Sequence, residues 1–146
     1  MLDLMRLASQ LGVQVHMAHI DDDPTLLGFY VHSHRTIVLR MGLTPTETRS
    51  VLAHELAHAY YGDTCSKGRE ERRADRFAAS LLIDPERYAA AEAVDEHPAA
   101  IADELQVTVD VVQTYQEQCL QRLGSRTYGR SWRVGLGGER ARQLSS

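Results

Sequence analysis

The segment H-E-L-A-H at residues 54–58 constrains this chain more than any other sequence feature. Two histidines four positions apart, His54 and His58, lie one turn apart on the same face of a helix, so both imidazoles can bind one metal ion. Glu55 stands beside them and can act as an acid/base carboxylate. The pattern is therefore typical of a zinc hydrolase. The alternative is a surface helix with two hydrogen-bonded histidines and a solvated glutamate.

The residues around this motif specify a helix. Thr44 and Glu47 can form a capping box, and Pro45 occupies the first helical position. Gly62 is the expected end of the helix. Apolar residues recur between these ends, at Val51, Leu52, Leu56 and Ala59. The sequence thus predicts a half-buried helix that carries the two histidines at one margin.

Zinc takes a third protein ligand, and the sequence excludes one known source of it. In the pattern H-E-x-x-H-x-x-G-x-x-H, the glycine and the third histidine are replaced here by Tyr61 and Thr64. A following helix over residues 70–82 is the expected source, because its apolar residues recur at intervals of three and four. Glu71 lies on the inward edge of this helix, whereas Glu70 is rotated by about 100° from it. A carboxylate on an apolar face needs a partner or a metal ion, so Glu71 is the predicted third ligand.

Asp75 follows Glu71 by one helical turn. It can accept a hydrogen bond from the second ring nitrogen of a zinc-bound histidine and so fix the tautomer of that ring. The alternative for both carboxylates is an ion pair with a neighbouring arginine, at Arg72, Arg73 or Arg76.

Together the two helices carry a pattern that resembles the ImmA/IrrE family of bacterial and phage zinc metallopeptidases. The shared pattern is H-E-x-x-H at residues 54–58, E-x-x-A-D-x-F-A at residues 71–78, and L-L followed by a proline within residues 81–85. Here the proline stands one place later than usual, and the linker between the helices is short. The resemblance implies one zinc ion (Zn²⁺) per chain, held by His54, His58 and Glu71, with Glu55 as the catalytic glutamate.

The resemblance also implies a regulatory role, because members of this family cleave transcriptional repressors or control their level. The expected function is that of a zinc-dependent endopeptidase acting on a specific regulatory protein, such as a repressor of a phage or mobile element. Two alternatives belong to other classes. The chain could be a non-catalytic zinc-containing module that sequesters a repressor, or it could be a DNA-binding regulator.

The expected fold class is α+β and zincin-like, with a small antiparallel sheet packed on the motif helix and a mainly helical C-terminal half. Alternating apolar residues predict strands near residues 13–17, 28–32 and 36–39. An exposed edge of such a sheet can bind a peptide as an added strand. Residues 1–124 are expected to form a single metallopeptidase domain.

Residues 98–123 are expected to form a helix-turn-helix-like pair within this domain. Its second helix, capped by Thr108, begins with Asp110 and has no positive charge before Arg122. Because DNA attracts lysine and arginine, a packing role is favoured over DNA reading. Residues 125–146 form a basic tail rich in Gly, Ser and Arg, which is expected to be flexible. Contact of the tail with nucleic acid is the alternative to a solvated tail or one docked on its own acidic domain.

Composition places the chain among ordinary globular proteins, with 43% hydrophobic and 25% charged residues. No apolar run reaches transmembrane length and no signal peptide opens the chain, so we expect no membrane partner. Two cysteines, Cys65 and Cys119, do not predict a disulfide framework, so we expect a protein of the reducing cytoplasm. Cys65 lies between the two expected helices, where an incidental cysteine is favoured over a regulatory thiol.

Other histidines and tyrosines are secondary candidates. His32 and His34 can lie near the cleft, although a surface or turn position is favoured for both. Tyr60, Tyr61 and Tyr88 can each donate a hydrogen bond to an oxyanion, and the sequence does not choose among them. A core aromatic role is the favoured interpretation for each tyrosine.

Overall fold

The structure is a computed structural model that describes residues 2–64, 67–120, 122–123 and 126–127. The chain divides into two compact units, Met1–Leu82 and Ile83–Ser146. The single domain over residues 1–124 therefore stays a prediction. Among the described residues, no helix has the length and apolar character needed to cross a membrane.

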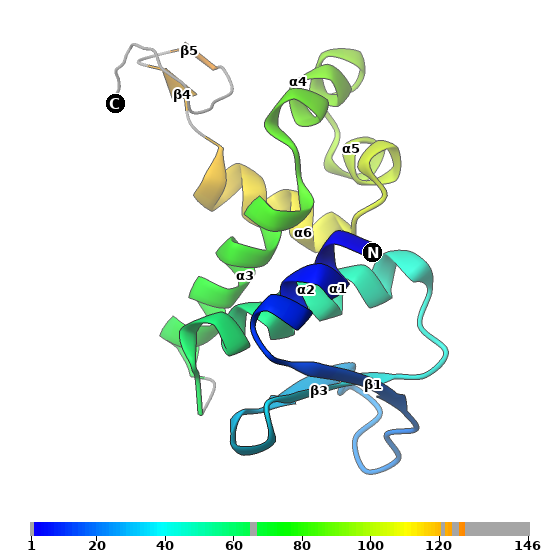
Figure 1. The fold of residues 1–146 in the computed structure, drawn as a ribbon. Helices are drawn as coiled ribbons and strands as arrows, with labels where there is room; N and C mark the ends of the chain where they lie inside the picture. Colours follow the sequence, from blue (N-terminus) through cyan, green and yellow to red (C-terminus); the bar gives the residue numbers. More distant parts are fainter. Residues whose placement is uncertain (1, 65–66, 121, 124–125, 128–146) are drawn as a thin grey trace. The chain divides into compact units, whose positions relative to one another are not determined.

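The first unit combines a small sheet with helices that pack on it (Figure 1). Its elements are α1 (Leu2–Gln10), β1 (Gln14–Ala18), β2 (Gly28–Val31), the 3-10 turn η1 (His32–His34), β3 (Thr36–Arg40), α2 (Pro45–Tyr61) and α3 (Gly68–Leu82). Helix α1 contacts β1, whereas α2 contacts β2, β3 and α3. The α+β class that the sequence predicts is confirmed.

The sheet has the strand order β1-β3-β2, so β3 is its central strand. Strands β2 and β3 pair antiparallel, with Tyr30 opposite Ile37, whereas β1 and β3 pair parallel, with Val15 opposite Ile37. The sheet is therefore mixed, which corrects the expectation of a purely antiparallel one. The tight β2–β3 connection, η1 and Arg35, requires antiparallel strands. The connection from β1 to β3 is long and includes β2 itself, which permits parallel pairing.

The core of this unit lies between the sheet and helices α1 and α2. The least exposed large side chains belong to β3 and α2: Ile37, Leu39, Leu52 and Leu56. Full burial of one such side chain stabilises a fold by about 1.5–3 kcal/mol relative to its exposure. Because Leu52 and Leu56 are committed to this core, the helical period of about 100° per residue places His54 and His58 on the opposite side of α2.

Helix α2 begins and ends where the sequence predicts. Thr44 Oγ1 accepts a hydrogen bond from the Glu47 backbone N–H at 3.1 Å, and the Glu47 carboxylate accepts one from the Thr44 N–H at 2.9 Å. Gly62 follows the helix in the left-handed region, at a φ of 69°. Glycine adopts this conformation without the steric penalty that a Cβ brings. Local interactions thus fix both ends of the motif helix.

The second unit is mainly helical, as the sequence predicts for the C-terminal half. Its described elements are α4 (Pro85–Val94), α5 (Pro98–Leu105), α6 (Val109–Thr114), the π-helical turn η2 (Tyr115–Cys119), β4 (Arg122–Leu123) and β5 (Arg126–Thr127). Thr108 caps α6, since its hydroxyl accepts from the Val111 N–H at 3.3 Å. The buried large side chains of this unit include Tyr88, Ile101, Leu105, Val112 and Tyr115.

The last helical segment is shorter than the sequence predicts. A continuous apolar stripe suggests a helix as far as Leu123, but helical backbone ends at Cys119, and Leu120 is extended. Strand β4 then begins at Arg122 and pairs antiparallel with β5. The Leu120 N–H donates to the Tyr115 carbonyl oxygen at 2.7 Å, so the helix ends in a wide π-helical turn.

Two expectations fall outside the described residues. The first is the flexible basic tail of residues 125–146, of which the structure describes residues 126–127 in β5. The second concerns Cys65 in the loop between α2 and α3. Both stay predictions.

Gly28 determines how closely strand β2 approaches helix α2. A Cβ at this position would lie 2.8 Å from Val51 Cγ1 and 2.9 Å from the Val38 carbonyl oxygen. We therefore expect Gly28→Ala to lower the free energy of unfolding by about 1–3 kcal/mol, measured by urea denaturation. Gly68→Ala is the control, because the nearest atom to its Cβ is the flexible side-chain tip of Arg72 at 3.2 Å. Equal stability of the two variants would contradict this account of Gly28.

Candidate metal centre

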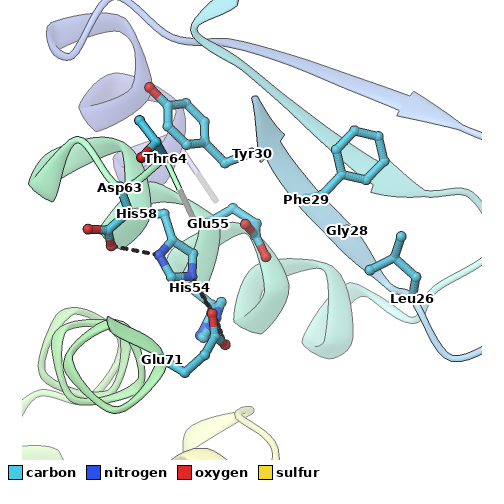
Figure 2. A pocket seen from close by; sticks show the side chains of 10 residues that line it. All are labelled: Leu26, Gly28, Phe29, Tyr30, His54, Glu55, His58, Asp63, Thr64 and Glu71. Carbon is cyan, nitrogen blue, oxygen red and sulfur yellow. Dashed lines mark hydrogen bonds and ion pairs between the residues drawn. The ribbon is translucent and has the colours of Figure 1, made fainter. Parts of the chain in front are cut away.

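Three side chains of α2 and α3 direct their donor atoms toward one place (Figure 2). The Nε2 atoms of His54 and His58 lie 3.2 Å apart. One carboxylate oxygen of Glu71 lies 3.0 Å from His54 Nε2, and the other lies 2.9 Å from His58 Nε2. Ligands of a tetrahedral zinc ion lie about 3.3 Å from one another, given bonds of about 2.0–2.1 Å to the metal. The donor types and their spacing therefore fit a zinc ion with little rearrangement.

Helix geometry explains this convergence. His54 and His58 lie one turn apart on α2, and their ring centroids are 4.8 Å apart. Helix α3 packs along α2, and Ala74 and Ala78 are buried on α3. Glu71 precedes Ala74 by about one turn, so it shares the face of α3 that is turned inward. Two helices thus supply ligands that lie far apart in the sequence.

Each imidazole is also held at its other ring nitrogen by a carboxylate. Asp75 Oδ1 lies 2.9 Å from His54 Nδ1, and Asp63 Oδ2 lies 2.9 Å from His58 Nδ1. A carboxylate accepts hydrogen bonds, so both rings donate Nδ1–H and present Nε2 to the shared point. The structure brings Asp75 to His54, and its role toward a bound zinc ion stays a prediction; the sequence did not indicate Asp63.

Glu55 lies in the same pocket and is 8% exposed. Burial raises the pKa of its carboxyl group; the charges of His54 and His58 lower it, and that of Glu71 raises it, with a net shift upward. A carboxylate with a raised pKa is a stronger base than a solvated one. Glu55 therefore combines the location and the basicity that a general base needs.

The donor atoms and Glu55 line an open pocket of about 250 Å³ (Figure 2). The other lining residues come from β2, from the residues before it and from the turn after α2: Leu26, Gly28, Phe29, Tyr30, Asp63 and Thr64. In the described sheet β2 pairs with β3 alone, so its other edge is free. The pocket thus lies between the motif helix and a free strand edge.

The carboxylates around His54 favour its protonated form. Burial lowers the pKa of His54, but the hydrogen bond to Asp75 and the negative charges of Glu55, Glu71 and Asp75 raise it to about 9. These groups therefore favour a protonated His54 at neutral pH. A metal ion that binds His54 Nε2 must compete with this protonation.

Most of the chain matches one protein family. A peptidase family model, described as the IrrE N-terminal-like domain, matches residues 8–114. The chain belongs to this family. The family is of the metallopeptidase type and is in general zinc-dependent. The resemblance to the ImmA/IrrE group that the motif indicates is thereby confirmed.

A solved structure of a Mycobacterium tuberculosis transcriptional regulator is similar to this chain, with a TM-score of 0.58 and 17% sequence identity. The match covers 82% of this chain and 42% of the regulator, so this chain spans less than half of the regulator's length. At this identity the likeness shows a shared fold. Among curated proteins, none matches the chain significantly.

The three tyrosines considered from the sequence do not line the described pocket. Tyr60 is 56% exposed and Tyr61 is 38% exposed, which contradicts the core role expected for both. The Arg73 guanidinium lies over the ring of Tyr61, and the distance from Arg73 Cζ to the ring centroid is 3.9 Å. Tyr88 is 1% exposed in the second unit, so the core role is confirmed for this residue.

Tyr30 and Asp63 are pocket residues that sequence reasoning missed. The sequence predicts a strand over residues 28–32, and the alternation of side chains along a strand could have placed Gly28 and Tyr30 on one side of it. The Tyr30 hydroxyl is hydrogen-bonded to His32 Nδ1 at 2.9 Å. Asp63 directly follows Gly62, and the helix-ending glycine was the available signal that the chain turns back there.

Zinc affinity is expected to increase between about pH 6.5 and pH 9. Because the pKa of His54 is raised from 6.5 to about 9, the ring stays protonated in the metal-free fold over this range. Protonation of His54 stabilises the fold fully below pH 6.5, and this stabilisation is lost as the pH rises through 9. Protons therefore compete least with zinc for His54 at high pH. Calorimetric titration at pH 7.5 in buffers of different ionisation enthalpy measures the protons that zinc releases.

Asp75→Asn is the variant that tests this protonation. It removes the charge that helps to raise the pKa of His54, so zinc binding should release fewer protons at pH 7.5 than in the wild type. Asp95→Asn is a matched control, because Asp95 is exposed and pairs with His97 in the second unit. Equal proton release by wild type and Asp75→Asn would refute the assignment.

Proposed function

We propose that this chain is a zinc-dependent endopeptidase that acts in the cytoplasm on a specific regulatory protein, a transcriptional repressor of a phage or mobile element. The observation that carries the proposal is the convergence of His54, His58 and Glu71 at separations of 2.9–3.2 Å beside the buried Glu55. Two imidazoles, a carboxylate ligand and an acid/base glutamate are the groups that metal-assisted hydrolysis needs. Membership of a peptidase family supports the same reaction class.

In this proposal His54, His58 and Glu71 hold one zinc ion per chain. When bound, the ion supplies Lewis-acid chemistry, polarising a peptide carbonyl and increasing the acidity of water. Glu55 accepts a proton from the attacking water on its carboxylate and then donates it to the leaving amine nitrogen. Asp75 keeps His54 in the tautomer that presents Nε2 to the metal.

The free edge of β2 offers a binding place for a peptide. The Leu27 carbonyl accepts a hydrogen bond from the Arg40 N–H at 2.9 Å, so it points toward β3. Along an antiparallel ladder this direction alternates, which turns the backbone polar groups of Gly28 and Tyr30 toward the free edge. Both residues line the pocket that contains Glu55. A peptide paired with this edge would pass the metal ligands, which favours a protein chain as substrate.

The proposed substrate class draws on the regulatory context of the comparisons, which include a transcriptional regulator of similar fold. Direct DNA reading by the second unit is less well supported. Asp110, Gln113 and Glu117 are exposed on α6 and η2, and they offer acidic or neutral groups to a phosphate backbone. Val112 and Tyr115 are buried, as expected of helices that serve packing.

Glu55→Gln is expected to keep zinc but to lose about two to four orders of magnitude in hydrolysis rate, because the amide cannot accept the proton. Rates are measured with a proteome-derived peptide library and mass spectrometry, and bound zinc is measured by atomic emission. Glu47→Gln is the control, since Glu47 belongs to the helix cap. Hydrolysis at nearly the wild-type rate by the Glu55 variant would rule out the proposed mechanism.

Glu71→Ala is expected to lose most of the bound zinc, because two histidines alone leave the metal without its third protein ligand. Glu70→Ala provides the matched control, as Glu70 is outside the ligand cluster found among the described residues. Zinc per chain is measured after reconstitution and gel filtration. Full zinc content in Glu71→Ala would show that the third ligand lies elsewhere.

Proteolysis and sequestration can be separated with native protein substrates. Zinc-loaded wild type and Glu55→Gln are each incubated with a native bacterial protein extract, and new N termini are labelled and identified. Termini that arise with the wild type alone, within a DNA-binding repressor, would support the proposal. A stable repressor complex formed equally by both chains without cleavage would instead indicate sequestration.

A further inference from the structure

Asp63 is outside the sequence motif, yet its side chain is only 8% exposed and contacts a proposed zinc ligand. We propose that Asp63 is a positioning residue of the metal centre, which fixes the His58 imidazole for metal binding and joins it through Arg73 to helix α3. This inference rests on the proposed function, because it assigns Asp63 a role toward the zinc ion of the same site.

The end of helix α2 places Asp63 against His58. The left-handed Gly62 reverses the chain, and the Asp63 N–H then donates to the His58 carbonyl oxygen at 2.9 Å. The Asp63 side chain contacts His58 as well, because its Oδ2 accepts a hydrogen bond from His58 Nδ1 at 2.9 Å (Figure 2). Asp63 therefore holds both the backbone and the ring of His58. With Nδ1 donating to Asp63, the nitrogen that remains for a metal is Nε2.

Arg73 supplies the charge that a nearly buried carboxylate requires. Its Nη2 donates to Asp63 Oδ1 at 2.7 Å, so each oxygen of Asp63 has a nitrogen donor. The Arg73 guanidinium also lies 3.9 Å from the centroid of the Tyr61 ring, which adds a cation–π contact. Arg73 follows Glu71 by two residues on α3. The contact between Asp63 and Arg73 therefore ties together the helices that carry all three proposed ligands.

The two histidines differ in how well their carboxylate partners are shielded from water. The side chain of Asp75, the partner of His54, is 50% exposed, whereas that of Asp63, the partner of His58, is 8% exposed. A hydrogen bond shielded from solvent is electrostatically stronger than an exposed one. We therefore expect Asp63 to affect metal binding more than Asp75 does.

Zinc affinity of the full chain, measured by competition with a chromophoric chelator, tests this role without using peptidase activity. Asp63→Ala is expected to weaken zinc binding by about 10–100-fold, with a smaller effect for Asp75→Ala. Asp63→Asn retains an acceptor oxygen for His58, so it should lose less affinity than Asp63→Ala. Asp84→Ala is the matched control, because Asp84 caps α4 by accepting from the Arg87 N–H at 3.0 Å. This control should lower the melting temperature and leave zinc affinity unchanged.

Proton NMR of the zinc-loaded chain separates positioning from a general loss of structure. The hydrogen-bonded Nδ1–H protons of His54 and His58 should give two protected downfield signals. Asp63→Ala should remove the His58 signal alone, and Asp75→Ala the His54 signal alone, while Asp63→Asn keeps both. If Asp63→Ala binds zinc within twofold of the wild type, or keeps the His58 signal, the inference is overturned. A wild-type chain that binds no zinc would overturn the proposed function instead.

Discussion

Helix α2 both packs into the hydrophobic core and carries two of the proposed zinc ligands, and the rest of the first unit depends on this constraint. Leu52 and Leu56 must remain in the core against the sheet, where they are almost completely buried. The helical period then leaves no freedom in where His54 and His58 point. The hydrophobic core therefore orients the face that carries the proposed zinc ligands His54 and His58, and α3 and β2 supply the other residues of the pocket. A change in the core packing of α2 would therefore also move His54 and His58.

Buried polar groups on this face of α2 need hydrogen-bond partners, and the neighbouring carboxylates provide them. His58 is 3% exposed, and an imidazole removed from water needs partners for both ring nitrogens. Asp63 accepts a hydrogen bond from Nδ1, which leaves Nε2 directed toward Glu71 and the proposed metal position. Asp63 in turn requires a cation, which Arg73 provides. The contacts thus run from the buried His58 through Asp63 to Arg73, whose side chain is partly exposed to solvent.

Much of the site could be predicted because its parts are related by helical periodicity. His54, Glu55 and His58 fall within about one turn of each other, and the capping residues at both ends of α2 act locally. Asp63 could not be found in this way, since its contact depends on the direction of the turn at Gly62. The parallel pairing of β1 with β3 was also missed, because strand order depends on contacts distant in sequence. Periodicity identifies which residues share a face, but it does not give the path of the chain between elements.

The imidazoles that would bind zinc are held at their other ring nitrogens, because Asp75 contacts His54 Nδ1 and Asp63 contacts His58 Nδ1. Glu71 contacts both histidines through Nε2, at 3.0 Å and 2.9 Å, close to the spacing required around a zinc ion. The acidic groups around His54 favour its protonated form, and the positive charge of the ring offsets part of their negative charge. Zinc would then replace a proton within an existing arrangement rather than assemble three distant ligands. Side chains held by such hydrogen bonds lose little conformational entropy when they bind a metal ion.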